Sequence, residues 1–265
     1  MKVFKTVNAI VITAISALLP YLSNAEDVDP SDLTQVNSFI SGTSSNAGNL
    51  NIMVGLAGSY SEGNNFVGLI DHGIETQGHD QGAQASRLRY FQVLDTHNQN
   101  ISQLGFSIDY MKNWALDKGA KGETATSDLF ALGFIGKVAT PWKNFSIFPN
   151  IAYVQGSVNQ KLKYQPNINA DFKGYQFNIF GSLDLGDAGY IIIQPQYMKL
   201  NMDDDTDNAN IFKVKTGYGK SLSKSKQWWA EISHTYINTS IAKSKLTQET
   251  NNDDHIIELA LSYYF

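Results

Sequence analysis

Apolar residues stand at every second position along most of this chain of 265 residues. From Leu50 onward, for example, Leu50, Ile52 and Val54 alternate with polar or smaller residues. A period of two is typical of a β-strand with one apolar face. Five further clear segments lie at 104–110, 130–138, 175–183, 212–218 and 257–265, and five weaker ones at 64–76, 84–95, 144–158, 189–203 and 227–240. The chain is therefore predicted to be all-β, with at least eleven strands.

The first 25 residues have the organisation of a secretory signal peptide. Lys2 and Lys5 precede an apolar run over 10–19, and the small residues Ser23 and Ala25 fit a signal-peptidase site. A membrane anchor helix is the alternative, but an apolar run of ten residues is too short to cross about 30 Å of hydrocarbon. We expect cleavage after Ala25, which leaves residues 26–265 as one domain.

Two features favour a membrane barrel over a soluble sandwich. The predicted strands span about 11–15 residues, whereas soluble strands average about 5–6 and a tilted membrane strand needs about 9–11. Short connections such as 61–64 alternate with longer polar ones such as 115–126, 159–170, 201–208 and 241–253, as in barrels with short periplasmic turns. A sandwich would bury its apolar faces between two sheets. We predict a transmembrane antiparallel up-and-down β-barrel over 26–265, with its apolar face toward lipid.

The last strand carries the most specific pattern. The chain ends on alternating apolar residues, namely Ile257, Leu259, Leu261, Tyr263 and Phe265. In this respect it resembles Gram-negative outer-membrane β-barrel proteins, both small porin-like barrels and solitary autotransporter-like barrels. The resemblance implies a place in the bacterial outer membrane, contact with its lipid and lipopolysaccharide, and recognition of these five residues by the barrel-assembly machinery.

The parity of the strands predicts their number. If the C-terminal strand ends at the periplasm, eleven strands would place the start of the first one outside the cell. A further strand within 31–42 would carry the chain outward, although Val36, Phe39 and Ile40 do not alternate cleanly. Twelve strands are expected because bacterial barrels have even counts, and ten strands are the alternative. Pro149 and Pro195 fall inside strands and are interpreted as bulge or edge positions, because proline lacks the ladder donor.

The inner face is predicted to carry paired charges. Turns near residues 98 and 80 would place Arg87 opposite Asp109 and Arg89 opposite Asp71, and opposite charges across a ladder attract. By the same alternation, other charged residues face the interior, namely Lys137, Lys213, Lys215, Glu231 and Glu258. These nine residues predict either a narrow pore lined by charge or a closed lumen filled by ion pairs.

The function that this pattern favours is a channel for small hydrophilic solutes. The alternative is a non-conducting structural or surface-interaction barrel whose outer loops, such as 115–126 or 241–253, act on other molecules. A membrane-embedded lipid-modifying enzyme is less favoured, because no His has a Ser two residues later, as barrel phospholipases require. A net charge of −5 argues against nucleic-acid binding.

Metal and cofactor sites are not predicted. The chain has no Cys, and its five His residues lack metal-ligand spacing. Asp203, Asp205 and Asp207 have the first spacing of a calcium loop, but Asn208 and Val214 stand where an EF-hand needs Gly and Glu. We interpret this segment as a solvated acidic loop, with bridging of a divalent cation to lipopolysaccharide as the alternative.

Overall fold

The computed structural model describes residue 30 and residues 37–77, 81–114, 124–161, 168–202, 208–243 and 246–265. The expected signal peptide 1–25 and the acidic segment Asp203–Asp207 lie outside the described residues. No helix in the described part of the chain is long and apolar enough to cross a membrane.

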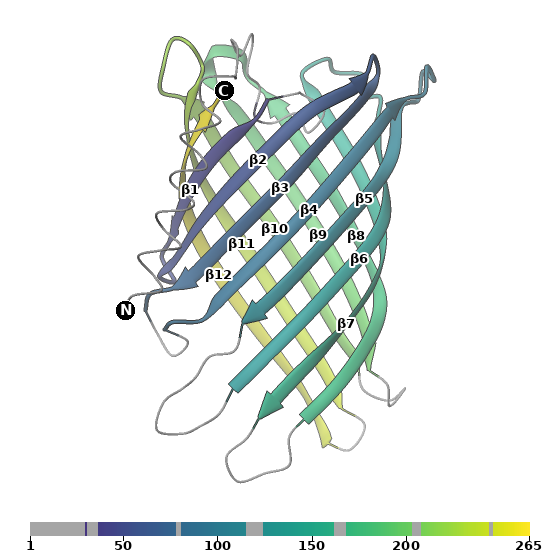
Figure 1. Ribbon diagram of the computed structural model, residues 1–265, viewed down its shortest axis with the longest axis vertical. Coiled ribbons are helices and arrows are strands. Elements are labelled where there is room, and N and C mark those ends of the chain that lie inside the picture. The colour runs from purple at the N-terminus through teal and green to yellow at the C-terminus, as the bar shows by residue number, and fades with distance from the viewer. Residues whose placement is uncertain are drawn as a thin grey trace.

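Twelve antiparallel strands, each hydrogen-bonded to its neighbours in the chain, close into a barrel (Figure 1). Strand β1 pairs with both β2 and β12, and this pairing closes the ring. The strand count confirms twelve rather than ten. The strands are β1 (Phe39–Ser45), β2 (Asn49–Ser61), β3 (Asn64–Glu75), β4 (Gln84–Asp95), β5 (Ile101–Trp114), β6 (Thr124–Val138), β7 (Phe145–Lys161), β8 (Ile168–Asp184), β9 (Tyr190–Met202), β10 (Asn208–Ser221), β11 (Trp228–Lys243) and β12 (Leu246–Tyr264), with a 3-10 turn at η3 (Gly186–Ala188).

The first strand lies further along the chain than the sequence indicated. Residues 31–42 were the expected location, but β1 runs from Phe39 to Ser45. Its second half contains Gly42, Thr43 and Ser44 in place of alternating large apolar residues, so its periodicity is weak. Pairing with β2 and β12 holds this segment in the wall despite the weak local pattern.

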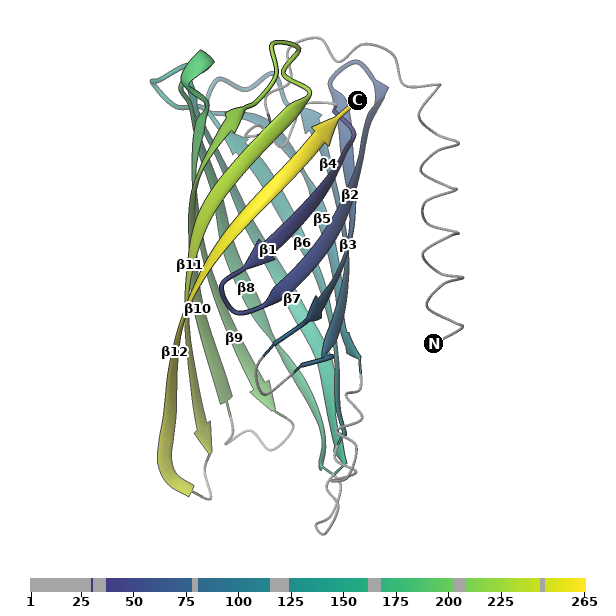
Figure 2. The ribbon, with the colours of Figure 1, turned by 90° about the vertical axis from the view of Figure 1, so that its left-hand side faces the viewer.

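One end of the barrel has an uneven rim (Figure 2). Strand β12 contains 19 residues and β1 only 7, so β1 pairs with β12 only over residues 258–264 of β12. Half of the expected connection 159–170 is strand, because β7 ends at Lys161 and β8 begins at Ile168. Most of the expected connection 241–253 is strand, because β11 ends at Lys243 and β12 begins at Leu246. These two connections are therefore shorter than expected. The other end carries the turns at 62–63, 96–100, 139–144, 185–189 and 222–227.

The interpretation of the two prolines as bulge or edge positions is also wrong. Pro149 pairs with Ile179, and Pro195 pairs with Val214, in ladders without a register shift. On the opposite side of each proline the ladder is interrupted. Between β6 and β7 the pairs flanking the gap are Ile135–Asn150 and Val138–Ile147, and between β8 and β9 they are Asn178–Gln196 and Gly181–Ile193, all in constant register. The missing donor thus costs ladder bonds on one side while the strand order is kept.

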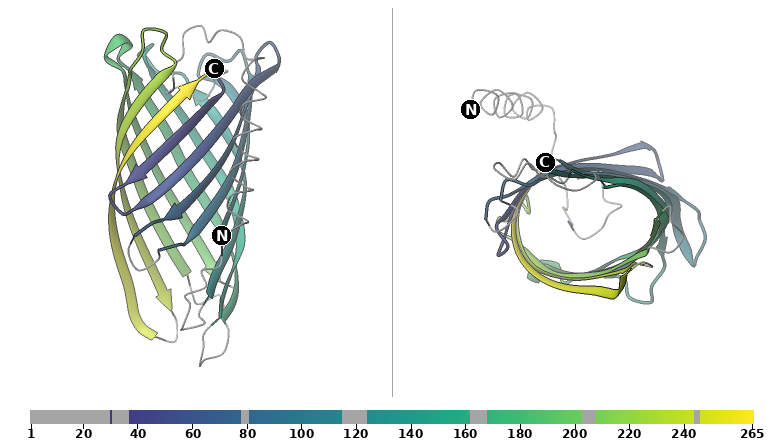
Figure 3. Two further views of the ribbon diagram at one scale, coloured as in Figure 1. Left: turned by 60° about the vertical axis from the view of Figure 1, so that its left-hand side comes forward. Right: turned by 90° about the horizontal axis from the view of Figure 1, so that it is seen from below.

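The outer face of the wall is apolar. Ile52, Leu132, Phe134 and Leu259 are all more than half exposed, which is the arrangement of a lipid-facing band. On β7 this face runs from Phe145 to Tyr153, which is a rise of about 20 Å for a strand tilted by about 40°. Beyond Tyr153 the outward residues become polar. The view along the axis shows the closed ring (Figure 3).

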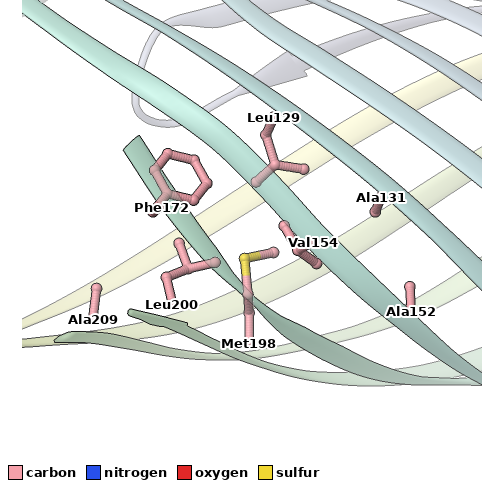
Figure 4. Packing of buried hydrophobic residues seen from close by; sticks show 8 residues of the cluster. All are labelled: Leu129, Ala131, Ala152, Val154, Phe172, Met198, Leu200 and Ala209. Carbon is pink, nitrogen blue, oxygen red and sulfur yellow. The ribbon is translucent and has the colours of Figure 1, made fainter. Parts of the chain in front are cut away.

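The inner face is less polar than the sequence indicated. Toward the uneven rim, eight buried residues of β6–β10 form an apolar cluster around Val154 and Phe172 (Figure 4). Toward the turn end, two further clusters contain Phe91, Phe148 and Trp229. The expectation of a polar interior is therefore wrong at both ends, where buried apolar side chains line part of the wall. Polar residues are concentrated between the clusters.

Candidate functional site: a charged belt inside the barrel

A cavity of about 420 Å³ lies inside the barrel between these clusters. Its charged lining residues, here called the charged belt, come from two opposite sides of the wall. Strands β3–β5 supply Asp71, Arg87, Arg89 and Asp109, and β10–β12 supply Lys213, Lys215, Glu231 and Glu258. Strands β4 and β10 are six positions apart in either direction around the ring, so their inward side chains face each other across the lumen.

Arg87 and Asp109 form a two-pronged ion pair. Arg87 donates from Nε to Asp109 Oδ1 at 2.8 Å and from a terminal nitrogen to Oδ2 at 2.5 Å. Such paired charge-assisted bonds fix the orientation of both groups. The side chains are 29% and 13% exposed, so the pair borders the cavity while most of its surface is covered.

Arg89 pairs with Asp71 at 3.0 Å and also donates to Met53 Sδ at 3.3 Å. Both Arg–Asp pairs are the expected ones, but the expected register is wrong by two residues. Arg87 stands opposite Met111 and Asp71, whereas Arg89 stands opposite Asp109 and Leu69. The ion pairs are therefore diagonal, which the long arginine side chains can span.

The other half of the charged belt centres on Lys215. Its Nζ lies 3.0 Å from Glu231 and 3.9 Å from Glu258. Glu231 also accepts a hydrogen bond of 2.8 Å from the Tyr190 hydroxyl. One lysine thus holds two carboxylates, and Tyr190 links this half of the belt to the apolar cluster at the turn end.

Lys213 differs from the other charged residues of the belt. It lines the cavity beside Gln196, to which it is directly opposite on β9. Within the described residues, it has neither an ion pair within 4.0 Å nor a hydrogen-bonded side-chain partner. The charges of Arg87, Arg89 and Lys215 repel it, and that of Glu258 attracts it.

Lys137, the ninth residue expected inside, is not part of the charged belt. Its Nζ lies 5.3 Å from the centre of the Phe148 ring in a cation–π contact near the turn end. Phe148 is only 1% exposed. Lys137 therefore faces inward but packs on the apolar cluster outside the cavity.

An amide network that the sequence did not suggest fixes the wall beside the charged belt. Asn178 donates to Asn150 Oδ1 at 2.9 Å, and Asn150 donates to Ser107 at 2.7 Å. All three side chains are buried. Since Asn150 also donates to the Phe134 carbonyl at 3.0 Å, the chain of bonds spans β5 to β8 and stiffens that part of the wall.

Aromatic rings narrow the lumen toward the turn end. Phe91 of β4 and Phe180 of β8 meet edge to face, with ring centroids 6.0 Å apart. Strands β4 and β8 are four positions apart in the ring, so this contact crosses the interior. It forms an apolar constriction next to the charged belt, a type of element that can control water passage in channels.

The five C-terminal residues of the expected assembly signal lie on one side of β12. Ile257, Leu259 and Leu261 are about half or more exposed on the outer face. Tyr263 contacts the ring of Trp228 at 4.9 Å, and the amide of Phe265 donates to the Ser38 carbonyl at 3.0 Å. The pattern thus continues the lipid-facing band to the end of the chain.

Two histidine contacts on the outer face were not expected. His72 lies 2.8 Å from Ser86 of the next strand, and Ser86 also accepts from the indole of Trp114. His234 lies 3.1 Å from His255. Residue spacing within one strand does not reveal these pairs, because each pair joins two neighbouring strands. In the described part of the chain no carboxylate orients His72, and no cluster of three metal-binding side chains occurs.

The closed barrel, with its lipid-facing outer band and its enclosed charged belt, can be compared with known proteins. No family model and no characterised protein matches the chain in sequence. Among solved structures, the KdgM porin matches with a TM-score of 0.45 and 9% identity, covering 87% of this chain and 99% of that one. The chain itself is a closed twelve-stranded antiparallel β-barrel with an apolar outer face. The barrel also matches the translocator domain of the autotransporter NalP from Neisseria meningitidis, with a TM-score of 0.44, 13% identity and 86% of each chain covered. OmpT from Vibrio cholerae matches with a TM-score of 0.39 and 8% identity, covering 86% of this chain and 98% of that one.

Proposed function

We propose that this barrel lies in the bacterial outer membrane and is a narrow channel for the passive passage of small hydrophilic solutes. The observation that supports the proposal is the cavity of about 420 Å³ lined by charged and amide side chains. A polar, enclosed passage through an apolar wall is what a hydrophilic solute needs to cross lipid. No cofactor and no catalytic step is part of this proposal.

The dimensions fit a narrow rather than a wide pore. Twelve strands about 4.8 Å apart and tilted by about 40° form a cylinder about 24 Å in diameter. Inward side chains reduce this width from both walls. The cavity that remains is lined by the charged belt and by Phe91 and Phe180, so only small solutes would pass.

Single-channel recording of the purified protein in planar bilayers tests the proposal. The expected result is ohmic current steps, with faster solute uptake by liposomes that contain the protein. Replacing both Arg87 and Arg89 by Ala should raise the conductance or shift the ion selectivity, because both line the cavity. Lys199→Ala, on the outer face of β9, is the matched control and should leave both quantities unchanged. Absence of any conductance would refute the channel.

A non-conducting interaction barrel is the second proposal. The Phe91–Phe180 contact across the interior supports it, as does the extension of β7 beyond the lipid-facing band to Lys161. In this case the function would reside at the uneven rim, and substitutions in 115–126 or 241–253 would impair the interaction with other molecules. Contacts with lipopolysaccharide and recognition of Ile257–Phe265 by the assembly machinery are proposed for either function.

A further inference from the structure

Hydrogen-bond donors exceed acceptors at one place in the charged belt. Its four carboxylates are all engaged, Asp109 by Arg87, Asp71 by Arg89, and both glutamates by Lys215. Lys213 has no such partner among the described residues. The belt therefore contains an ammonium group that lines the cavity without a carboxylate bound to it.

A second donor in the lining of this cavity is also unsatisfied. Arg89 Nε is buried and has no hydrogen-bond partner within the part of the chain that the structure describes. A buried donor without an acceptor costs about 1–3 kcal/mol. Arg89 and Lys213 line the same cavity from opposite walls, and their charges act on each other. An anion in the cavity would be attracted by the positive charges of both groups.

The neighbours of Lys213 suit an anionic oxygen group. Gln194 and Gln196 of β9 also line the cavity, and Gln196 stands directly opposite Lys213. An amide can donate further hydrogen bonds to the same anion. The cavity volume of about 420 Å³ lies within the range of about 300–1,000 Å³ typical of sites for small ligands.

We propose that the cavity binds the carboxylate of a small organic acid between Lys213 and Arg89, and that small carboxylates are the solutes the barrel prefers. This inference rests on the proposed channel function, whose solute class it specifies. The two arginines and Lys213 provide attraction for the anion, while the ion pairs hold the flanking residues in place. A neutral solute of the same size would lack these contacts.

Two measurements with succinate as the probe test the site. In bilayers, succinate should reduce the chloride current in a saturable manner, and Lys213→Gln should weaken this block at least tenfold. In detergent, calorimetric titration of the folded protein should show the same loss of succinate affinity. Lys213→Arg, which keeps the charge, should show the succinate block and the succinate affinity of the wild type. Glucose at equal concentration should neither block nor bind.

The Lys215→Gln variant distinguishes succinate binding at a specific site from a general effect of lumen charge on the succinate block. It removes the same charge from the same strand, but Lys215 is already held by two carboxylates. Its succinate block should weaken less than that of Lys213→Gln. Equal weakening in both variants would overturn the inference. So would block by inorganic phosphate but not by succinate, because the carboxylate would then be the wrong class.

The outcomes distinguish the site from the channel. If current steps occur but succinate block and affinity are the same in wild type and in Lys213→Gln, the channel proposal stands and the site is overturned. Binding of succinate to the folded protein without current steps would support the site and refute the channel. The Lys199→Gln variant, which removes a lysine from the outer face, should behave as wild type in both measurements.

Discussion

Gly105 in β5 should tolerate no side chain, and replacing it by Ala is a direct test of the register. It stands opposite Val93 of β4 and Ile135 of β6. A Cβ built on Gly105 would lie 1.7 Å from the Gln92 carbonyl oxygen and 2.8 Å from Val93 Cα. These are backbone atoms, so no side-chain rotation can relieve the overlap. Because carbon contacts need about 3.5 Å, the two strands would have to separate.

The size of the effect follows from two costs. Overpacking of this kind costs about 1–3 kcal/mol, and loss of one ladder hydrogen bond adds about 0.5–1.5 kcal/mol. We therefore expect Gly105→Ala to lower the free energy of unfolding by about 2–4 kcal/mol. Since β4 carries Arg87 and Arg89, the displacement should also disturb the charged belt and change the conductance.

Gly42→Ala in β1 is the matched control. A Cβ at Gly42 would meet nothing within 4 Å, and Ala in a strand interior is favoured over Gly by about 0.5–1 kcal/mol. Unfolding by urea in lipid vesicles, followed by the fluorescence of the four Trp residues, measures both variants. A change of less than about 0.5 kcal/mol in Gly105→Ala, which is the range of an ordinary surface substitution, would refute the register at β4–β5.

Three further predictions concern the lumen, the outer face and the chain end. Replacing Phe91 and Phe180 by Ala should raise single-channel conductance, because their contact crosses the lumen, whereas Phe134→Ala on the outer face should not; equal effects would place the constriction elsewhere. Leu132→Arg should reduce the free energy of unfolding by about 2–4 kcal/mol, because a cation would face the middle of the lipid band; an unchanged urea midpoint would mean that Leu132 does not face lipid. Deleting Phe265 should lower the amount of barrel assembled in cells but leave refolding in detergent at its normal rate, and slow refolding would indicate a structural role instead.

The fold was predictable because the signal that specifies it is local. Alternation of apolar residues along Leu50–Tyr60 or Ile257–Phe265 reports which face of a strand is apolar, and it does so without knowledge of the partner strand. The inward direction of Arg87, Lys213 and Glu231 follows from the same alternation. What the sequence did not predict was the start of β1, because short runs of small residues carry little periodic signal.

The sequence by itself determined the number of strands, the approximate position of most of them and the face on which the residues of the charged belt lie. Only the tertiary structure decided which residues meet. A shift of two residues between neighbouring strands leaves every side chain on the same face, so alternation could not distinguish the register at Arg87 from the one found. A contact across the lumen such as that of Phe91 with Phe180, and the placement of Arg89 and Lys213 in the lining of one cavity, depend on strand number and stagger, which are set when β1 closes the ring on β12.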